Sequence, residues 1–269
     1  MILDDIVAAR RRELVQTREL VPLDEIEKRI AVQRPPLDFA AALRDKGVSI
    51  IAEVKKASPS RGLLCPDFDH MRLAKTYAAS EAAAVSVLTE SRYFQGSLEH
   101  LREIRVTPGL ERMPLLRKDF LFDEYQVYES RAAGADAILL IVALLEDKQL
   151  GELMALASAM DMACLVEAHD ENEVNRALES GARLVGINNR DLRTFEVNIG
   201  TTERLRPLVP PECVAVSESG ISTTKAIGKL RDWGVDAALV GEALVTAGDV
   251  SARLAGLVRA GSGEVEVGN

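Results

Sequence analysis

The sequence predicts an α/β protein, a (β/α)8 TIM barrel with an N-terminal helical extension. Two observations predict this fold: eight short apolar segments alternate with helix-length amphipathic segments, and one phrase that joins a helix end to a strand recurs along the chain. Strict alternation of strands and helices favours a parallel sheet. Eight such units favour a closed barrel over an open doubly wound sheet, which usually has fewer strands.

Residues 1–48 are predicted to form a helical extension that packs on the barrel. Positions 4–30 are rich in Arg, Glu, Leu and Ile, with apolar residues roughly at helical spacing, and Pro35-Pro36 ends the pattern. A short second helix is predicted over 38–44. The barrel is predicted over 49–260, and a flexible tail over 261–269.

The recurring phrase is a helix end with Gly or another small residue, then Ala or Val, and then an apolar strand. It occurs at 80–87, 133–140, 180–187 and 233–240. Each copy is interpreted as a helix C-cap glycine that leads into a buried parallel strand. The other four strands are predicted over 49–54, 114–117, 162–166 and 213–216. Segments 124–133 and 222–233 are typical of the intervening helices.

Composition and charge argue against several classes of protein. The chain has 269 residues, of which 47% are hydrophobic and 28% charged, as in a globular protein with a large core. A formal charge of −9 and 4% aromatic residues argue against a nucleic-acid surface. No apolar run is long enough to span a bilayer and residues 1–5 show no secretion signal, so we expect a cytoplasmic protein that contacts neither nucleic acid nor membrane.

Cysteines and histidines are too few and too scattered to indicate a metal site. The three cysteines lie far apart and form no CxxC pair. His70, His100 and His169 also lack the close spacing of a catalytic zinc or iron site. We therefore expect no metal and no other cofactor.

Polar residues and glycines end the predicted strands, where a TIM barrel places its active site. These strand ends carry Glu53, Lys55, Lys118, Glu167, Asn188, Arg190, Glu218, Ser219, Gly220 and Gly241. A buried strand has no packing reason to end in a charge that faces the barrel axis, because burying an unpaired charge is costly. Any one of them, such as Glu218, is equally well explained as a solvated or paired residue, but the whole set predicts a site.

Two glycine-bearing turns, 217–221 and 240–244, are predicted to cradle a phosphate. Glycine allows backbone N–H groups to approach an anion closely. A short helix that starts at Gly241 would point its positive end at the phosphate, the usual arrangement after strands seven and eight of such a barrel.

With these residues in place, the sequence resembles the indole-3-glycerol phosphate synthase family over essentially its whole length. The leading motif is IAEVKKASPSRG at 51–62, which resembles the first strand and the mobile first loop of that family. Five further stretches resemble its later strand ends in order: 94–97, 116–120, 165–167, 186–192 and 217–221.

The resemblance implies a carboxy-lyase of tryptophan biosynthesis. Such an enzyme closes the ring of 1-(o-carboxyphenylamino)-1-deoxyribulose 5-phosphate, with loss of carbon dioxide and water, to give indole-3-glycerol phosphate. It implies that Lys118 is the general acid, Glu167 a general base and Lys55 the cation that holds the substrate carboxylate. Glu53, Asn188 and Glu218 would support them. We expect burial beside Lys55 to draw the pKa of Lys118 toward neutrality, and which lysine acts at which step stays open.

Substrate-binding residues are implied by the same resemblance. The phosphate site would comprise Ser58, Ser219, Gly220 and Gly241, while Pro59 belongs to the closing loop at 58–62 and Arg190 would lie near the reacting carboxylate or hydroxyls. For Phe94 and Phe120, packing at the barrel rim and holding the anthranilate ring carry equal weight. Two positions depart from the family: Glu242 stands where some members carry a small hydroxyl residue, and Arg61 where Lys is frequent.

Two other functions are weighed against this one. A related phosphate-binding barrel, phosphoribosylanthranilate isomerase or the tryptophan synthase α chain, would use a different acid and base. An isomerase of that kind needs a Cys and Asp pair, and no Cys ends the first strand here. A module that only captures sugar phosphates would keep the cradle and lose the acid. The chain is expected to act on its small-molecule substrate as a monomer.

Overall fold

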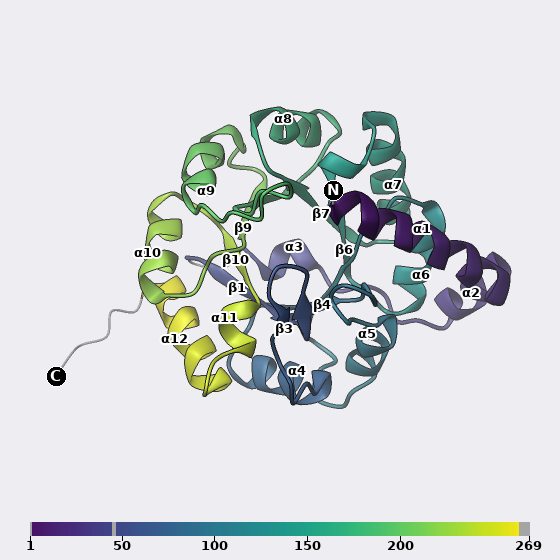
Figure 1. The fold of residues 1–269 in the computed structure, drawn as a ribbon, viewed down its shortest axis with the longest axis horizontal. Helices are drawn as coiled ribbons and strands as arrows, with labels where there is room; N and C mark the ends of the chain where they lie inside the picture. Colours follow the sequence, from purple (N-terminus) through teal and green to yellow (C-terminus); the bar gives the residue numbers. More distant parts are fainter. Residues whose placement is uncertain (1, 45–46, 264–269) are drawn as a thin grey trace.

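A closed barrel of eight parallel strands forms the core of the computed structural model, which describes residues 2–44 and 47–263 (Figure 1). Around the barrel the strands follow the order β1-β10-β9-β8-β7-β6-β5-β4. They are β1 (Ser49–Val54), β4 (Ala84–Leu88), β5 (Leu115–Lys118), β6 (Ala137–Ile141), β7 (Ala163–Ala168), β8 (Leu184–Asn188), β9 (Val214–Glu218) and β10 (Ala237–Val240). The predicted fold class is confirmed, and each strand ends within two residues of the end of its predicted segment.

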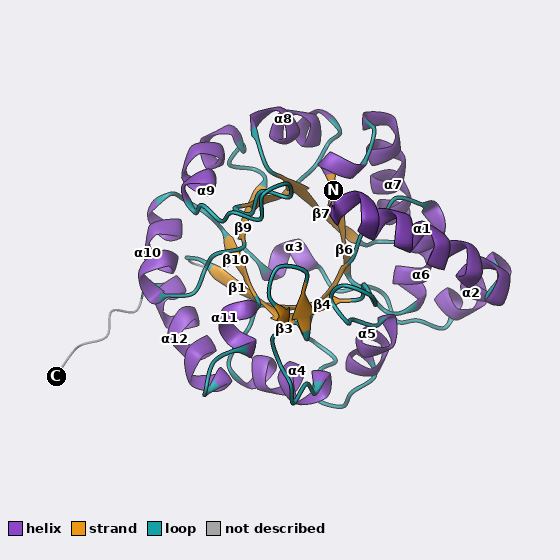
Figure 2. Ribbon diagram, in the orientation of Figure 1, coloured by secondary structure: helices purple, strands orange, loops and turns teal. Residues whose placement is uncertain are grey.

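Helices surround the barrel as a ring (Figure 2). They are α4 (His70–Ala79), α5 (Leu98–Arg105), α6 (Glu124–Ala132), α7 (Asp147–Ala159), α8 (Glu171–Glu179), α9 (Gly200–Leu205), α10 (Thr224–Asp232), α11 (Glu242–Val245) and α12 (Val250–Ser262), with 3-10 turns at Val142–Leu144 and Arg206–Leu208. Several begin at a residue whose side chain accepts a hydrogen bond from a first-turn N–H: Asp69, Ser97, Asp123, Asp170, Thr223 and Asp249. These caps satisfy N–H groups that have no partner within the helix and so fix where each helix starts.

The N-terminal extension comprises α1 (Ile2–Leu20), α2 (Leu23–Ala31) and α3 (Phe39–Ala42). The first break was expected at Pro35-Pro36, but the chain already breaks at Pro22. Proline has no backbone N–H and its ring clashes with the preceding helical turn, so α1 ends before it and α2 starts after it. The short helix predicted over 38–44 is α3, which Asp38 caps.

The extension contacts both ends of the barrel. α1 starts at the rim of the mouth beside β7 and runs outward past β6 (Figure 1). On this helix Ile6 is buried, and Arg10 Nη2 lies 2.8 Å from Oδ2 of Asp119, which follows β5. At the other end α3 buries Phe39 and Leu43 in the same cluster as the inward-facing strand residues. The extension therefore plugs one end of the barrel and borders the mouth at the other.

Side chains along each strand alternate between the barrel interior and the helix layer, because successive residues of a strand point to opposite faces. On β5, Leu116 packs inside the barrel, whereas Arg117 faces the helix layer and donates to Ser130 Oγ on α6 at 3.1 Å. This alternation turns Lys118 back toward the interior. It does the same for the acidic residues that end or nearly end β1, β7 and β9.

The recurring helix-to-strand phrase contains glycine at positive φ in three of its four copies. Gly134, Gly181 and Gly234 have φ values of 88°, 89° and 73°. The copy at 80–87 has no glycine, and Glu81 adopts a φ of 61° instead, so the prediction of a C-cap glycine there is wrong. The turn requires a left-handed residue, which glycine adopts freely and other residues adopt at some cost.

The last helix extends beyond the predicted barrel boundary. A flexible tail was expected from residue 261, but α12 continues to Ser262 and ends at Gly263, which is left-handed. Gly261 is buried, and its carbonyl accepts a hydrogen bond of 3.0 Å from Val48 N. This bond joins the end of the helix to the residue before β1. The rest of the predicted tail, 264–269, lies outside the described residues.

Gly261→Ala is expected to lower the free energy of unfolding by about 1–3 kcal/mol, the usual cost of overpacking. A Cβ at this position would lie 2.1 Å from Val48 O, a backbone atom that cannot move aside cheaply. Gly256→Ala on the same helix is the matched control, because its Cβ meets nothing within 4 Å. That variant should instead stabilise the protein by about 0.5–1 kcal/mol in urea unfolding. Equal effects of the two substitutions would contradict the packing account.

Candidate active site

A cavity of about 530 Å³ opens at the carboxyl ends of the barrel strands. All the residues that the sequence analysis selected line it: Glu53, Lys55, Ser58, Pro59, Phe94, Lys118, Phe120, Glu167, Asn188, Arg190, Glu218, Ser219, Gly220 and Gly241. They come from different strands and loops between residues 53 and 241. The closed barrel therefore brings them to one mouth, as the pattern of strand ends predicted for all but Ser58, Pro59, Phe94 and Phe120, which the family resemblance implied.

Four charged side chains form a layer across the mouth of the barrel. Glu53, Glu218, Glu167 and Lys118 come from β1, β9, β7 and β5, which are alternate strands in the barrel order. Layers of four side chains from alternate strands are the usual way in which such a barrel is filled. Here the outermost layer is charged rather than apolar.

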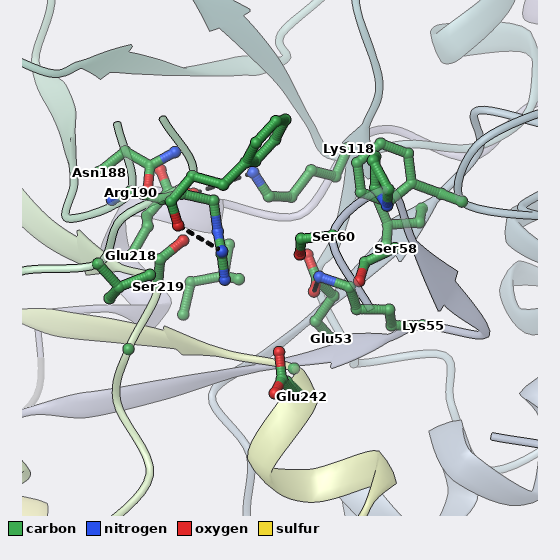
Figure 3. Close-up of a pocket in the computed structure, with 18 of the residues that line it drawn as sticks. Glu53, Lys55, Ser58, Ser60, Lys118, Asn188, Arg190, Glu218, Ser219 and Glu242 are labelled. Carbon is green, nitrogen blue, oxygen red and sulfur yellow. Dashed lines mark hydrogen bonds and ion pairs between the residues drawn. The ribbon is translucent and has the colours of Figure 1, made fainter. Parts of the chain in front are cut away.

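Lys118 is the cation of this layer, and it reaches across the cavity (Figure 3). Its Nζ lies 3.2 Å from Glu167 Oε2 and 3.0 Å from Glu218 Oε2. The two glutamates are almost fully buried, and the lysine side chain is 16% exposed. Each buried carboxylate thus has a charged partner, which is the condition for burial without a large penalty.

The expected fall in the pKa of Lys118 is not what the structure shows. Burial does lower the pKa of this ammonium group, but Glu218, Glu167 and Glu53 raise it, and the net result is a pKa above the ordinary value. Lys55, the expected source of repulsion, has its Nζ 3.2 Å from Glu53 Oε2 and is itself paired. Lys118 is therefore held in its protonated form.

The two carboxylates beside Lys118 have pKa values that move in opposite directions. Burial raises the pKa of Glu167, but Lys118 and a hydrogen bond to His169 lower it, so that its pKa falls well below the ordinary value. Burial raises the pKa of Glu218 to about 7, with Glu167 adding to the rise and Lys118 opposing it. A pair of acids separated in this way gives one ionised base and one group that is partly protonated at neutral pH.

The backbone beyond Lys118 is fixed by a second, outward-facing set of charges. Asp119 Oδ2 lies 2.8 Å from Arg10 Nη2 and 3.1 Å from Arg117 Nη2, and it accepts a 2.6 Å hydrogen bond from Thr89. Burial raises the pKa of Asp119, but Arg10 and Arg117 lower it below its ordinary value. The end of β5 is thereby anchored to α1 and to β4.

Lys55 and two aromatic rings form another wall of the cavity. The Nζ of Lys55 lies 5.7 Å from the centroid of the Phe94 ring, within reach of a cation–π contact. The rings of Phe94 and Phe120 are 6.1 Å apart and tilted by 40°. A flat aromatic ligand would therefore meet a paired aromatic surface with a cation at its edge.

Two inward-facing glycines make room for the charged layer. A Cβ at Gly241 would lie 2.2 Å from Glu53 Oε2, and a Cβ at Gly186 would lie 2.3 Å from Glu218 Oε1. Both glycines belong to the strands between the charged ones, at the end of β10 and within β8. Gly241 was selected for anion binding. The close approach of Glu53 is a second reason why this position needs glycine.

The turn after β9 is held in an unusual conformation. Ser219 and Gly220 have φ values of 66° and 77°, which only glycine adopts without strain. Asn189 Nδ2 donates to Ser219 O and to Ser217 Oγ, at 3.0 Å each. The Asn189 side chain, which the sequence analysis did not select, therefore positions this turn.

Ser58 presents a free hydroxyl to the same cavity. It lies on β2 (Ala57–Ser58), which pairs with β3 (Gly62–Leu63) as a short antiparallel hairpin where only a mobile loop was expected. Its Oγ is buried and has no hydrogen-bond partner in the described part of the chain. A buried polar atom without a partner beside a cavity indicates a place for a ligand atom.

Arg61 and Glu242, the two positions that depart from the family pattern, contact each other. Arg61 Nη2 lies 2.8 Å from Glu242 Oε1, so the β2–β3 hairpin is joined to the first residue of α11. The two charges offset one another beside Gly241. A carboxylate that would repel an anion is therefore paired rather than free.

Asn188 ends β8 and Arg190 follows it, on the opposite side of the cavity from Ser58 and Lys55 (Figure 3). Asn188 Oδ1 accepts a 3.0 Å hydrogen bond from Arg190 N, and Arg190 Nη1 donates to Phe195 O at 3.2 Å. The loop that follows places Phe195 and Val197 in the lining. Neither of these two residues belongs to a strand end, so the sequence pattern could not select them.

The sequence analysis also missed contributions from outside the barrel. Leu3 and Ile6 of α1 line the cavity, although more than 40 residues separate them from the first strand. His169, two residues beyond Glu167, contacts that carboxylate from behind. The position of His169 directly after β7 could have marked it as a site residue. No local sequence pattern indicated which face of α1 meets the mouth of the barrel.

Among residues 2–44 and 47–263, no helix is long and apolar enough to cross a membrane. In the same part of the chain, no group of three or more His, Cys, Asp or Glu side chains could hold a metal ion.

Comparison with known proteins gives a consistent family. A family model described as indole-3-glycerol phosphate synthase matches residues 3–257. An indole-3-glycerol phosphate synthase of Dehalococcoides mccartyi is 51% identical over 255 residues, covering 94% of this chain and 98% of the relative. One from a Roseiflexus species is 50% identical over 259 residues, covering 94% and 96%.

Solved structures share the fold at low identity. A 3-hexulose-6-phosphate synthase from Salmonella typhimurium has a TM-score of 0.64 at 12% identity, over 79% of this chain and 98% of that one. A thiamine phosphate pyrophosphorylase from Pyrococcus furiosus has a TM-score of 0.59 at 16% identity, over 81% and 96%. At these identities the likeness shows the barrel fold alone.

Glu218→Gln is expected to stabilise the protein relative to the wild type more at pH 8 than at pH 5. The folded pKa of Glu218, about 7, lies above the ordinary 4.5. Its contribution to stability is therefore complete below pH 4.5 and is lost as the pH rises through 7. The free energy of unfolding of the wild type therefore falls by roughly 3 kcal/mol over this pH range. The glutamine variant does not ionise and avoids this fall. Urea unfolding at both pH values measures it, with the exposed Glu196→Gln as control, and a difference that does not change with pH would contradict the assignment.

Proposed function

The chain belongs to the indole-3-glycerol phosphate synthase family, and on that premise we propose which of its residues perform each step. The function is that of the family: a carboxy-lyase of tryptophan biosynthesis acts on a small molecule, closing the ring of 1-(o-carboxyphenylamino)-1-deoxyribulose 5-phosphate with loss of carbon dioxide and water. The observation that carries the assignment of roles is the position of Lys118 between Glu167 and Glu218 at the floor of the cavity.

Lys118 acts as the general acid of ring closure. The aryl carbon attacks the ketone carbon of the sugar, a C–C bond forms, and the carbonyl π electrons move to oxygen, which takes a proton from Lys118 Nζ. The three carboxylates that raise the pKa of Lys118 keep this proton in place until the oxygen becomes strongly basic. Glu218, with a pKa of about 7 and its Oε2 at 3.0 Å, returns a proton to the lysine afterwards.

Glu167 acts as the general base. Carbon dioxide leaves and its bonding electrons return to the ring. The new hydroxyl then takes the proton that Glu218 has returned to Lys118 and departs as water, while the adjacent carbon of the new ring, which came from C1 of the sugar, loses a proton to Glu167. A carboxylate whose pKa is held below its ordinary value is ionised and ready to accept that proton. Asn188, which donates a hydrogen bond to Glu167, supports its orientation.

The aromatic part of the substrate is assigned to the wall formed by Lys55, Phe94 and Phe120. An ammonium group at the edge of paired rings suits an anthranilate, which is a carboxylate on an aromatic ring. Rim packing and ring binding, which the sequence left in balance, are compatible because both phenylalanines line the cavity while touching each other. Glu53 holds Lys55 at 3.2 Å.

The phosphate is assigned to the region between the β2–β3 hairpin and the last two strands. The unpartnered Ser58 hydroxyl and the left-handed Ser219-Gly220 turn offer donors there, with Gly241 alongside. Pairing with Arg61 removes the repulsion that Glu242 would otherwise exert. Pro59 lies in the same hairpin, whose closure would exclude water and hold the reacting groups together. Arg190 is assigned to the reacting carboxylate or the hydroxyls of the substrate.

The assigned acid, base and phosphate donors all come from one chain, and this supports the further proposal that the protein acts as a monomer. We also propose a cytoplasmic location, because the family's reaction is a step of tryptophan biosynthesis. The rival barrels are set aside by the family match over residues 3–257. A module that only binds sugar phosphates would not need a lysine clamped between two buried carboxylates.

Lys118→Ala is expected to lower kcat at least about a hundredfold with little change in substrate affinity, the loss typical of a general acid. Product formation is followed by the fluorescence of the indole, and substrate binding by calorimetry with the inactive variant. Lys56→Ala is the control, because Lys56 is a neighbouring lysine that does not line the cavity. Near wild-type turnover without Lys118 would remove it from the acid role.

A further inference from the structure

His169 lies immediately behind the proposed base, outside the cavity lining. It follows the end of β7, and its side chain is 13% exposed. The imidazole Nε2 is 3.3 Å from Glu167 Oε1, and Nδ1 is 2.9 Å from Glu173 Oε2 on α8. One ring thus bridges two carboxylates, one at the mouth of the barrel and one in the helix layer.

Carboxylates at both nitrogens favour the doubly protonated ring. The groups that face His169 are Glu167 from β7, Glu173 from α8 and the more distant Asp191 from the loop after β8. Burial lowers the pKa of His169, but hydrogen bonds to Glu167 and Glu173 raise it to about 10. Both ring N–H groups are therefore present at neutral pH, with Nδ1 hydrogen-bonded to Glu173 and Nε2 close to a Glu167 oxygen.

The two oxygens of Glu167 have different cationic partners. Oε2 lies 3.2 Å from Lys118 Nζ, and Oε1 lies 3.3 Å from the His169 ring. The contact between Nε2 and Glu167 is long, and within the described residues Nε2 has no aligned hydrogen-bond acceptor. Catalytic hydrogen bonds are often long before substrate binds and tighten in the reacting complex.

The other side of the ring is anchored more firmly. Glu173 Oε2 accepts hydrogen bonds from both His169 Nδ1 and His169 N, at 2.9 Å each. Asp170 Oδ1 in turn accepts from Glu173 N, also at 2.9 Å. These bonds form a reciprocal cap on the first turn of α8. The imidazole therefore stands on a rigid helix start and presents Nε2 to the base.

We infer that His169 is a positioning residue, which fixes the orientation of the Glu167 carboxylate through Nε2 while Glu173 holds the ring. The inference rests on the proposed role of Glu167. With Lys118 on one oxygen and His169 on the other, the carboxylate plane cannot rotate as the proton is taken. A misplacement of about 1 Å can cost up to about a hundredfold in rate, so a buttress of this kind affects catalysis without touching substrate.

Substitution of His169 by Asn or by Gln tests the two contacts of the ring separately. The amide nitrogen of Asn can replace Nδ1 and keep the bond to Glu173, whereas that of Gln can replace Nε2 and reach Glu167. His169→Asn is therefore expected to lower kcat about tenfold or more with KM nearly unchanged. His169→Gln should recover most of that loss. A structural role in capping α8 predicts the reverse order, and that result would overturn the inference.

A double-mutant cycle with Glu167→Gln supplies the second test. If His169 acts through Glu167, then H169N in the E167Q background should change kcat by no more than about twofold, the scatter of additive sites. The same fold loss in both backgrounds would show that His169 acts elsewhere. His100→Asn, on α5 away from the cavity lining, is the control and should leave kcat unchanged.

The same cycle tests the base role of Glu167 separately from the positioning role of His169. Near wild-type kcat in E167Q would refute the proposed base, whatever His169 does. A slow E167Q together with a fast H169N would refute only the positioning role. Melting temperatures of all variants verify that each folded state is intact before kcat values are compared.

Discussion

The site depends on one constraint: a charge that faces the interior of a closed barrel must meet an opposite charge there. Lys118 meets that constraint with Glu167 and Glu218, at 3.2 and 3.0 Å. A lone ammonium or carboxylate at the same depth would be costly to bury, so the three groups stabilise one another only as a set. The arrangement keeps the acid protonated, keeps one carboxylate ionised, and leaves the other near pKa 7. Acid and base chemistry at neutral pH follows from that division.

Closure of the barrel makes this set geometrically possible. The charged residues come from alternate strands, and the intervening strands β8 and β10 contribute Gly186 and Gly241, whose missing side chains leave space for Glu218 and Glu53. Charged strands thus alternate with glycine-bearing strands from β1 through β10, β9 and β8 to β7. Further supports stand behind it, with Asp119 anchored by two arginines on one side and the His169–Glu173 contact on the other. Each support acts on backbone or side-chain orientation rather than on substrate.

The sequence predicted the barrel and the lining residues at the strand ends because both follow from short-range rules, whereas Ser58, Pro59, Phe94 and Phe120 were implied only by the resemblance to the family. Strand period fixes which residues face inward, and parallel strands bring their carboxyl ends together. What depended on contacts between distant segments could not be read in this way. Leu3 and Ile6 line the cavity only because α1 docks on the mouth. The pKa of Lys118 was predicted in the wrong direction because the prediction counted burial and Lys55 but not the convergence of three carboxylates. The pairing within the β2–β3 hairpin is local, but its strands of two residues each are too short to show an alternating pattern in the sequence.

A titration of the two buried carboxyl groups would examine the central claim most directly. Glutamate labelled with carbon-13 at Cδ reports the ionisation of each side chain by NMR, and the substitutions Glu167→Gln and Glu218→Gln assign the two resonances. We expect Glu218 to titrate near pH 7 and Glu167 to stay ionised throughout the pH range in which the protein is folded. Two carboxyl groups that titrate together near the ordinary value of 4.5 would contradict it.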